Sequence, residues 1–290
     1  MTDFELNGST MICGVMGDPV EHSVSPAMHN AAFRKLGLNY VYLPFRVSRD
    51  RLAGAVEGIR ALHIAGMNIT IPHKVSIIPL LDEVDPLAQR IGAVNILHNK
   101  DGRLTGGNTD ADAFLRMIKE HGIDGPGLPA VVLGAGGASR AVCFALASLG
   151  CGITILNRNV GKARDCAADL EKYTGRASAV LELNRDNLAA ALTDAGLVVN
   201  TTSLGMSPHT DESPVDSGLL KRRHIVVDIV YNPVVTRLLR DAEKAGARII
   251  GGLDMLAWQG ALSFEIWTGC RAPVDVMRRA AAEAVKRYEK

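Results

Sequence analysis

A run of small residues, Gly134-Ala135-Gly136-Gly137-Ala138, follows the apolar segment 130–133 and precedes a segment with apolar residues at helical spacing. A glycine turn between a strand and a helix lets the backbone approach a pyrophosphate, whose charge then faces the helix N-terminus. The motif alone is weak, because a tight strand-to-helix connection has the same composition. A second strand-like run at 152–156 completes the pattern of strand, turn, helix and strand. We therefore expect all five residues of the turn to bind a dinucleotide cofactor.

The end of the second strand-like run carries Asn157 and Arg158, with Lys162 close behind. An acidic side chain at this point would accept hydrogen bonds from a free ribose 2′-hydroxyl, whereas positive charge suits a 2′-phosphate. The sequence thus predicts NADP as the cofactor. The alternative is that Arg158 is an ordinary solvated loop residue.

Polar side chains also lie where other predicted strands end, which is where an open α/β sheet presents its ligands. Ser23 and Ser25 stand at the start of a predicted helix and could bind a carboxylate, although Ser25 also suits a helix N-cap. Asn68 and Thr70 share one face of an otherwise apolar strand. Buried polar groups need partners, and a polyhydroxylated ligand would supply them here.

The remaining candidates each have a simpler interpretation. Lys74 follows the strand that carries Thr70, where a solvated lysine is the commoner finding, and Asp110 precedes an apolar-periodic helix, where it could be only an N-cap. Asn95 could equally be a turn residue. Gln259 comes one helical turn after Met255, near Gly252, and an ordinary solvated helix residue is the alternative for it.

The elements that must position these residues alternate between strand and helix over the first hundred residues, which predicts an α/β fold with a mainly parallel sheet. Gly102 marks the turn of one antiparallel hairpin. The pattern predicts strands at 10–16, 40–45, 66–71, 93–98 and 103–105, and helices at 25–36, 50–62, 74–81 and 88–91.

The second part of the chain contains the nucleotide unit between two glycine pairs, Gly106-Gly107 and Gly251-Gly252, which we interpret as hinges. We expect a substrate-binding domain at 1–107, completed by the closing helices in 253–290, and a Rossmann-type domain at 108–252. The predicted elements are helices at 110–121, 253–267 and 273–288 and strands at 197–200, 225–228 and 248–250.

Composition excludes several classes of protein. With 290 residues, 47% hydrophobic and 22% charged, the chain is typical of a globular protein, and its net charge of +1 argues against a nucleic-acid-binding surface. No stretch is long and apolar enough for a membrane span, and Asp3 and Glu5 are unsuited to a signal peptide. The five scattered cysteines favour a reducing cytoplasm. The histidines show no metal-ligand spacing, so we expect no metal.

Eight ordered motifs stand along the chain: HSxSPxxHN at 22–30, NxTxPxK at 68–74, GAVN at 92–95, GxNTD at 106–110, GAGGA at 134–138, NRxxxKA at 157–163, NxTxxGM at 200–206 and DxxYxPxxTxLL at 228–239. Over about residues 13–268, the chain resembles the shikimate dehydrogenase family through these motifs. It departs from the family pattern at Ile96, Ala111, Ala113 and Asn159.

This resemblance implies the reversible reduction of 3-dehydroshikimate to shikimate with NADPH, in aromatic amino acid biosynthesis through the chorismate pathway. Lys74 and Asp110 would be the catalytic pair, with the formal acid left open between them. The implied substrate-binding residues are Ser23 and Ser25 on the carboxylate, Thr70, Asn95 and Gln259 on ring hydroxyls, and Tyr231. The implied cofactor-binding residues are the five of the glycine turn, Asn157, Arg158, Lys162, Thr201, Ile229, Gly252 and Met255.

Two alternatives share these residues. One is a quinate/shikimate dehydrogenase that prefers NAD, and the other is a non-catalytic sensor of the same fold that binds the same ligands. The retention of both Lys74 and Asp110 weighs against the sensor. A small-molecule substrate is the expected partner, with no nucleic acid and no membrane, for a cytoplasmic monomer or homodimer.

Overall fold

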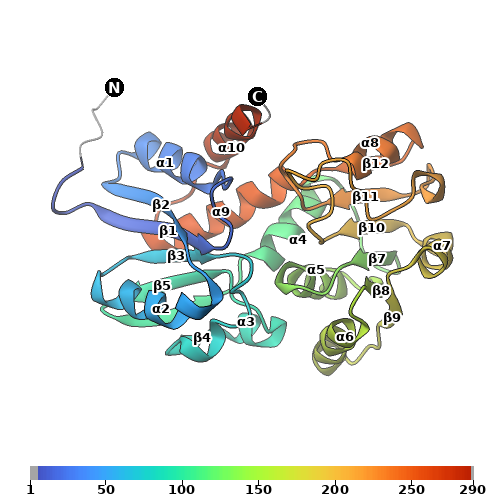
Figure 1. Cartoon of the computed structure of the whole chain (residues 1–290), viewed down its shortest axis with the longest axis horizontal. Coiled ribbons are helices and arrows are strands. Elements are labelled where there is room, and N and C mark those ends of the chain that lie inside the picture. The colour runs from blue at the N-terminus through green and yellow to red at the C-terminus, as the bar shows by residue number, and fades with distance from the viewer. Residues whose placement is uncertain (1–5, 289–290) are drawn as a thin grey trace. The chain divides into compact units, whose positions relative to one another are not determined.

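A computed structural model of the chain describes residues 6–288, so the expectation drawn from Asp3 and Glu5 lies outside the described residues. The chain divides into two compact units (Figure 1). Unit 1 contains residues up to Thr109 and again from Ala257, and unit 2 runs from Asp110 to Leu256. Each unit contains one six-stranded sheet with helices packed on it, which confirms the predicted α/β fold.

The sheet of unit 1 has the strand order β2-β1-β3-β5-β6-β4. The pairs β1–β2, β1–β3 and β4–β6 are parallel, whereas β3–β5 and β5–β6 are antiparallel, so the sheet is mainly parallel as predicted. The hairpin between β5 and β6 turns at Asp101-Gly102. The strands are β1 Met11–Gly17, β2 Tyr40–Arg46, β3 Gly66–Ile69, β4 Glu83–Val84, β5 Ile96–Lys100 and β6 Arg103–Gly107.

The helices of unit 1 form where the apolar periodicity predicts them. The first ends at Gly37, whose φ of 65° is left-handed and favours glycine. The helices are α1 Ser25–Leu36, α2 Leu52–Ala61, α3 Pro86–Ile91 and α10 Val274–Tyr288, with α9 Gly252–Thr268 joining unit 1 from Ala257 onward. Helix α10 packs on α1, and Phe33 and Phe264 stack at 5.2 Å in the core.

The predicted helix at 74–81 is wrong. The segment forms a series of turns and ends in a short 3₁₀ helix, Ile78–Leu80. Pro79 has no N–H to donate to the Val75 carbonyl four residues back, and that carbonyl accepts from the Ile78 N–H at 3.3 Å instead. In addition, the Lys74 carbonyl accepts from the Val94 N–H at 2.7 Å, instead of from a residue one turn ahead.

The glycine pair Gly106-Gly107, which we interpret as a hinge, forms the last two residues of strand β6. Their lack of a side chain has a packing reason. A Cβ at Gly106 would lie 2.5 Å from Leu81 Cδ1, and one at Gly107 would lie 2.8 Å from Asp85 Oδ2. A side chain at either position would therefore have to displace the side chain of Leu81 or Asp85.

The sheet of unit 2 is parallel throughout, with the order β12-β11-β10-β7-β8-β9. This is the doubly wound Rossmann order, in which the chain reverses direction across the sheet at β7. Its strands are β7 Pro129–Leu133, β8 Gly152–Asn157, β9 Ala179–Glu182, β10 Leu197–Asn200, β11 Ile225–Asp228 and β12 Arg248–Ile250. Its helices are α4 Asp110–Glu120, α5 Gly137–Ser148, α6 Val160–Thr174, α7 Arg185–Asp194 and α8 Arg237–Lys244.

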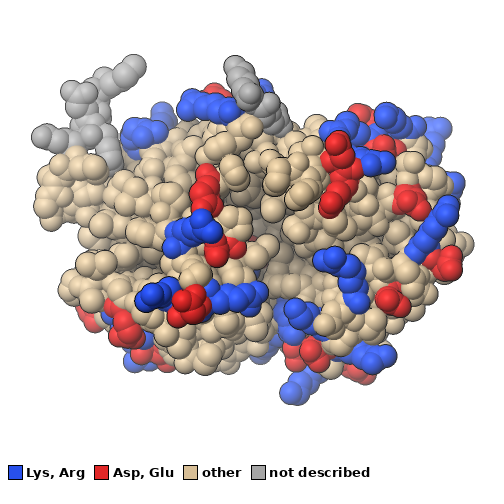
Figure 2. Space-filling model, in the orientation of Figure 1, with Lys and Arg blue, Asp and Glu red and all other residues tan. Residues whose placement is uncertain are grey.

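The apolar runs of β7 and β10 are buried on both faces, as parallel strands covered by helices require. Within residues 6–288, no helix is long and apolar enough to cross a membrane. The same residues contain no group of three or more His, Cys, Asp or Glu side chains that could hold a metal ion. On the face drawn in Figure 2, basic and acidic side chains are interspersed.

Candidate substrate and cofactor sites

The loop between β1 and α1 presents Ser23 and Ser25. The residue before the helix is Val24, and Ser25 is the first helical residue, with no side-chain cap. The Ser25 N–H instead donates to Ser23 Oγ at 3.3 Å. The capping interpretation of Ser25 is therefore wrong, and the Ser23 hydroxyl lies beside the Ser25 N–H at the start of α1, where an anion is favoured.

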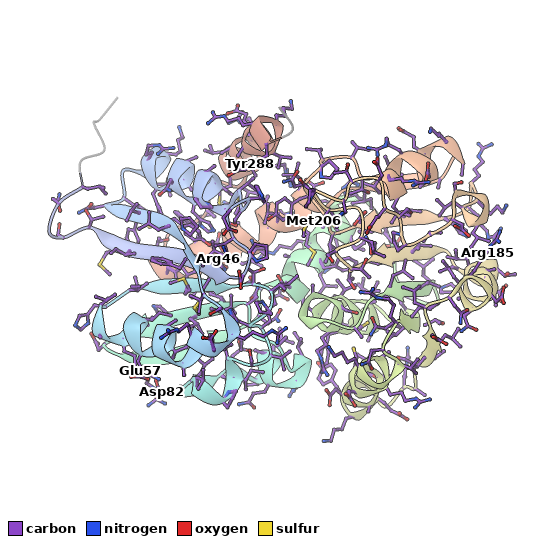
Figure 3. All side chains as sticks on the ribbon, in the orientation of Figure 1. Arg46, Glu57, Asp82, Arg185, Met206 and Tyr288 are labelled. Atoms are coloured by element: carbon purple, nitrogen blue, oxygen red, sulfur yellow. The ribbon has the colours of Figure 1, made fainter. Side chains whose placement is uncertain are left out.

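This loop is held from two sides. Arg46, at the end of β2 (Figure 3), contacts Asp18 Oδ1 through Nε at 2.8 Å and Glu21 Oε1 at 3.1 Å. Backbone N–H groups of Glu21 and Val20 and the Arg46 guanidinium hold the pKa of the Glu21 carboxyl below its usual value. Tyr288, on α10, donates to the Glu21 carbonyl at 3.4 Å. These contacts fix the backbone that carries Ser23.

At the end of β3, Asn68 and Thr70 differ in their surroundings. The buried Asn68 amide accepts from Tyr42 Oη at 2.7 Å and donates to Ser263 Oγ at 2.9 Å and to the Asn95 carbonyl at 3.3 Å. The expectation that a ligand supplies the partners of Asn68 is therefore wrong. Thr70 follows the strand and is half-buried. Among residues 6–288 its hydroxyl has no hydrogen-bond partner, so Thr70 remains a candidate for ligand binding.

Lys74 lies in the turns that follow β3, and its backbone is anchored on both sides. Its carbonyl accepts from the Val94 N–H at 2.7 Å. The buried His73 ring contacts the Val47 carbonyl through Nε2 at 2.6 Å, which fixes the residue before Lys74. The Lys74 side chain itself is half-buried. The structure therefore fixes the backbone of Lys74, four residues after Thr70.

Asn95, Thr109 and Gln259 are brought together from distant segments. The Thr109 N–H donates to Asn95 Oδ1 at 2.7 Å, and Asn95 Nδ2 donates to Thr109 Oγ1 at 2.9 Å. Thr109 Oγ1 also donates to the Gln259 carbonyl at 3.2 Å. The side chain of Asn95 therefore joins two segments, which a simple turn residue would not do. Asp110 follows Thr109 directly and is the first helical residue of α4, so its carboxyl is not in the N-cap position.

In unit 2, the glycine turn joins β7 to α5 as the sequence predicts. Gly134 has a φ of +113°, which side chains rarely adopt, and a Cβ there would lie 2.6 Å from Thr201 Oγ1. The Gly134 N–H donates to the Leu156 carbonyl at 2.8 Å, and Ser139 Oγ donates to the Gly134 carbonyl at 2.6 Å. A Cβ on Gly136 would meet no atom within 4 Å. The turn is therefore rigid and accessible at Gly136, which fits a pyrophosphate.

The end of β8 presents Asn157 and Arg158. Asn157 Nδ2 donates to the Asn159 carbonyl at 2.8 Å, and Asn159 caps α6 by accepting from the Lys162 N–H at 3.1 Å. The departure from the family at Asn159 thus preserves a helix cap. Arg158 and Lys162 are exposed, and neither forms an ion pair with any residue of 6–288. Two cations without acidic partners at this point fit a 2′-phosphate.

Two loops of unit 2 are organised by Asp228, which sequence reasoning matched to a motif without giving it a role. Asp228 Oδ1 accepts from Asn200 Nδ2 and the Val230 N–H, both at 3.0 Å, and Oδ2 accepts from Thr236 Oγ1 at 2.6 Å. Burial raises the pKa of Asp228 to about 6, although the three hydrogen bonds lower it. A charged residue at the end of an apolar strand was the signal for this role.

The remaining predicted residues of unit 2 lie after β10 and β11 and at the start of α9. Thr201 follows β10, and its hydroxyl donates to the Leu133 carbonyl at 2.7 Å, beside the glycine turn. Ile229 and Tyr231 follow β11 directly. A Cβ on Gly252 would lie 2.3 Å from the Ile229 carbonyl oxygen, so Gly252 is packed against that loop. Met255 lies one turn further along α9.

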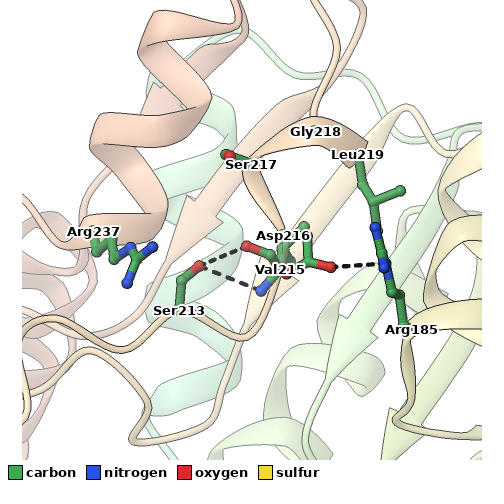
Figure 4. A pocket seen from close by; sticks show the side chains of 8 residues that line it. All are labelled: Arg185, Ser213, Val215, Asp216, Ser217, Gly218, Leu219 and Arg237. Atoms are coloured by element: carbon green, nitrogen blue, oxygen red, sulfur yellow. Dashed lines mark hydrogen bonds and ion pairs between the residues drawn. The ribbon is translucent and has the colours of Figure 1, made fainter.

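A pocket of 620 Å³ in unit 2 contains none of the predicted residues. Figure 4 shows the residues that line it, with Asp216 directed at Arg185. Asp216 pairs with Arg185 at 3.2 Å, and Arg237 pairs with Asp241 at 3.6 Å. The pocket therefore does not contribute to the candidate cofactor site.

Two family models and a curated relative match the chain. Residues 15–97 match the model of the shikimate dehydrogenase substrate binding domain, and residues 252–282 match that of the shikimate 5′-dehydrogenase C-terminal domain. A shikimate dehydrogenase (NADP(+)) of Methanopyrus kandleri is 49% identical, over 97% of this chain and 98% of its own.

Two solved structures agree in sequence and in fold. A shikimate dehydrogenase in complex with NADP+ has a TM-score of 0.91 at 40% identity, covering 97% of this chain and 98% of its own. The Thermus thermophilus enzyme in complex with NADP(H) and shikimate has a TM-score of 0.83 at 40% identity, covering 94% of this chain and 99% of its own. By sequence and by fold, the chain belongs to the shikimate dehydrogenase family.

Proposed function

We propose that the protein is an NADP-dependent oxidoreductase that interconverts 3-dehydroshikimate and shikimate, as a step of aromatic amino acid biosynthesis through the chorismate pathway. The observation that carries this proposal is the anchored backbone of Lys74, four residues after Thr70, in a chain whose Rossmann unit carries the exposed Arg158 directly after strand β8. Relatives that match nearly the whole chain are named for the same activity.

The two domains predicted from the sequence would have separate roles. Residues 1–107, completed by 253–290, would bind the substrate, and residues 108–252 would bind NADP. The Gly134–Ala138 turn would hold the pyrophosphate, with Thr201 and Ile229 beside it. Asn157, Arg158 and Lys162 would hold the 2′-phosphate, and Gly252 and Met255 would contact the nicotinamide end.

Substrate binding in unit 1 follows from the groups that the fold presents. Ser23 and Ser25, at the start of α1, would hold the carboxylate. Thr70, Asn95 and Gln259 would hydrogen-bond the ring hydroxyls. Tyr231, from the loop after β11 in unit 2, would complete the contacts with the substrate.

When bound, NADP supplies the hydride-transfer chemistry. The side chains must then stabilise the charge that develops on the substrate oxygen and transfer a proton to it. Reduction of the ketone develops negative charge on that oxygen, and the Lys74 ammonium would stabilise it. Lys74 and Asp110 would deliver the proton as a coupled pair and accept it back in the reverse direction. Asp110 is suited to this because the anchored Thr109 is its direct neighbour.

Replacement of Lys74 tests this role. We expect Lys74→Ala to lower kcat by about 10²–10⁴-fold, the usual contribution of an acid–base group. Lys100→Ala is the matched control, because Lys100 is an exposed lysine at the end of β5 in the same unit. A Lys74→Ala protein whose rate stays within about threefold of the parent would remove Lys74 from the chemistry.

Oxidation rates with shikimate and quinate, each with NADP and NAD, separate this activity from its alternatives. We expect shikimate with NADP to be the fastest combination. A preference for NAD and quinate would favour the quinate-type enzyme, and binding of shikimate with no turnover would favour the sensor.

We further propose that the protein acts in the cytoplasm, as a monomer or homodimer. Its five cysteines are all free and four of them are buried, as small core residues in a reducing compartment would be.

A further inference from the structure

We propose that Ser263, a residue of α9 with no assigned role, is a positioning residue for substrate binding. Its hydroxyl would hold Gln259 and Thr109 in the arrangement that the substrate ring requires. This inference rests on the proposed function, because that proposal assigns substrate binding to Gln259 and catalysis to Asp110, the neighbour of Thr109.

The Ser263 hydroxyl is fully buried and joins three segments of unit 1. Its Oγ accepts from Asn68 Nδ2, on β3, at 2.9 Å. The same oxygen donates to the Gln259 carbonyl, one turn earlier in α9, at 2.9 Å. It also lies 3.4 Å from Thr109 Oγ1, at the end of unit 1. One hydroxyl thus contacts a strand, a helix and the residue before Asp110.

A bond from a serine to the carbonyl four residues back is common in helices and does not by itself indicate a function. Helix α9 contains a second example, because Thr268 Oγ1 donates to the Phe264 carbonyl at 2.8 Å. Ser263 differs in the two further contacts, to Asn68 and to Thr109. Those contacts connect it to the groups that surround the candidate substrate site.

The network beyond Ser263 leads to each proposed ring-binding group of unit 1 except Thr70. The Gln259 carbonyl accepts hydrogen bonds from the hydroxyls of both Ser263 and Thr109. These bonds fix the turn of α9 that carries the Gln259 side chain. Thr109 in turn binds both ends of the Asn95 amide. Asn68 is held at its other end by the buried Tyr42 hydroxyl. The network is therefore closed and rigid, and Ser263 is its junction.

Removal of this one hydroxyl would leave the Asn68 amide with its longer bond, 3.3 Å to the Asn95 carbonyl. The amide would then turn toward another acceptor, because a buried donor without a partner is costly. Gln259 and Thr109 would lose a shared contact at the same time. We expect weaker and less well-oriented binding of the substrate, with binding of NADP unchanged.

The test compares Ser263→Ala with Thr268→Val, which removes a hydroxyl of the same kind from the same helix without touching the network. For Ser263→Ala we expect kcat/KM for shikimate to fall by about tenfold, the effect of one neutral buried hydrogen bond, with KM for NADP within about twofold of the parent. Thr268→Val should keep both parameters near those of the parent. The shikimate Kd from calorimetry should weaken in parallel for Ser263→Ala alone.

The outcomes separate this inference from the proposed function. If the parent oxidises shikimate and Ser263→Ala does so equally well, Ser263 has no positioning role. Equal losses in Ser263→Ala and Thr268→Val would show a structural role only. If the parent binds shikimate without turnover, the proposed function fails, and the calorimetric comparison still decides the role of Ser263. A parent that does not bind shikimate contradicts both.

Discussion

Replacement of Asp228 by Asn should change how the stability of the protein depends on pH. Asp228 is fully buried, and its two carboxyl oxygens accept three hydrogen bonds. Burial nevertheless raises its pKa from 3.8 to about 6. The ionised carboxylate is therefore less stable in the folded protein than in the unfolded chain. Asn has nearly the same shape and stays neutral at every pH.

The size of the effect follows from this difference in pKa. A higher pKa in the folded state means that folded protein binds the proton more tightly, so its stability falls as pH rises from about 4 to about 6 and is level above. The shift of about two units corresponds to about 3 kcal/mol in total. Between about pH 4.5 and about pH 7.5, the free energy of unfolding of Asp228→Asn should rise by about 2 kcal/mol relative to that of the parent.

Urea unfolding of the parent and of Asp228→Asn over this pH range measures the difference directly. Asp194→Asn is the matched control, since Asp194 is an exposed carboxyl at the end of α7 in the same unit. The difference in free energy of unfolding between the parent and Asp194→Asn should not change with pH. If the free energies of unfolding of the parent and of Asp228→Asn differed by the same amount at every pH, the reasoning would be refuted, because burial would then not disfavour the charged form.

Two further predictions concern the cofactor site. Arg158→Ala should raise KM for NADP by about 10–100-fold and leave KM for NAD nearly unchanged, because only NADP carries the 2′-phosphate that a charged hydrogen bond would recognise. Steady-state kinetics with both cofactors measure this difference. Lys172→Ala, on the exposed surface of α6, is the control. Gly134→Ala should lower the free energy of unfolding by about 2 kcal/mol or more, since its φ is +113° and its Cβ would lie 2.6 Å from Thr201 Oγ1. Gly136→Ala, where the added Cβ meets no atom, should leave urea unfolding nearly unchanged, and equal losses in the two variants would contradict the role of Gly134.

The sequence predicts those parts of the fold that local chemistry decides. The strand, glycine turn and helix around Gly134 could be predicted because only glycine suits the turn and the apolar runs have helical and extended spacing. The predicted helix at 74–81 failed because Pro79 and the bond from Val94 to Lys74 outweigh the apolar pattern. Local reasoning does not detect a hydrogen bond whose partner comes from a distant segment.

The same limit applies to the candidate sites. The candidate site residues could be selected from the sequence, because motifs place polar groups at strand ends. The hydrogen-bond partners of Asn68 could not be predicted, since Ser263 lies 195 residues away in the chain. For the same reason, the capping interpretation of Ser25 could be rejected only once the structure showed Val24 before the helix. Positioning residues such as Asp228 and Ser263 emerge from the tertiary contacts.

The most direct test of the central claim is the absorbance of reduced nicotinamide after the protein is mixed with shikimate and NADP. We expect NADPH to accumulate, faster than NADH does with NAD, and Lys74→Ala to abolish nearly all of the rate. If the folded parent protein produced no NADPH from shikimate and NADP, the account of the protein as an NADP-dependent shikimate dehydrogenase would be contradicted.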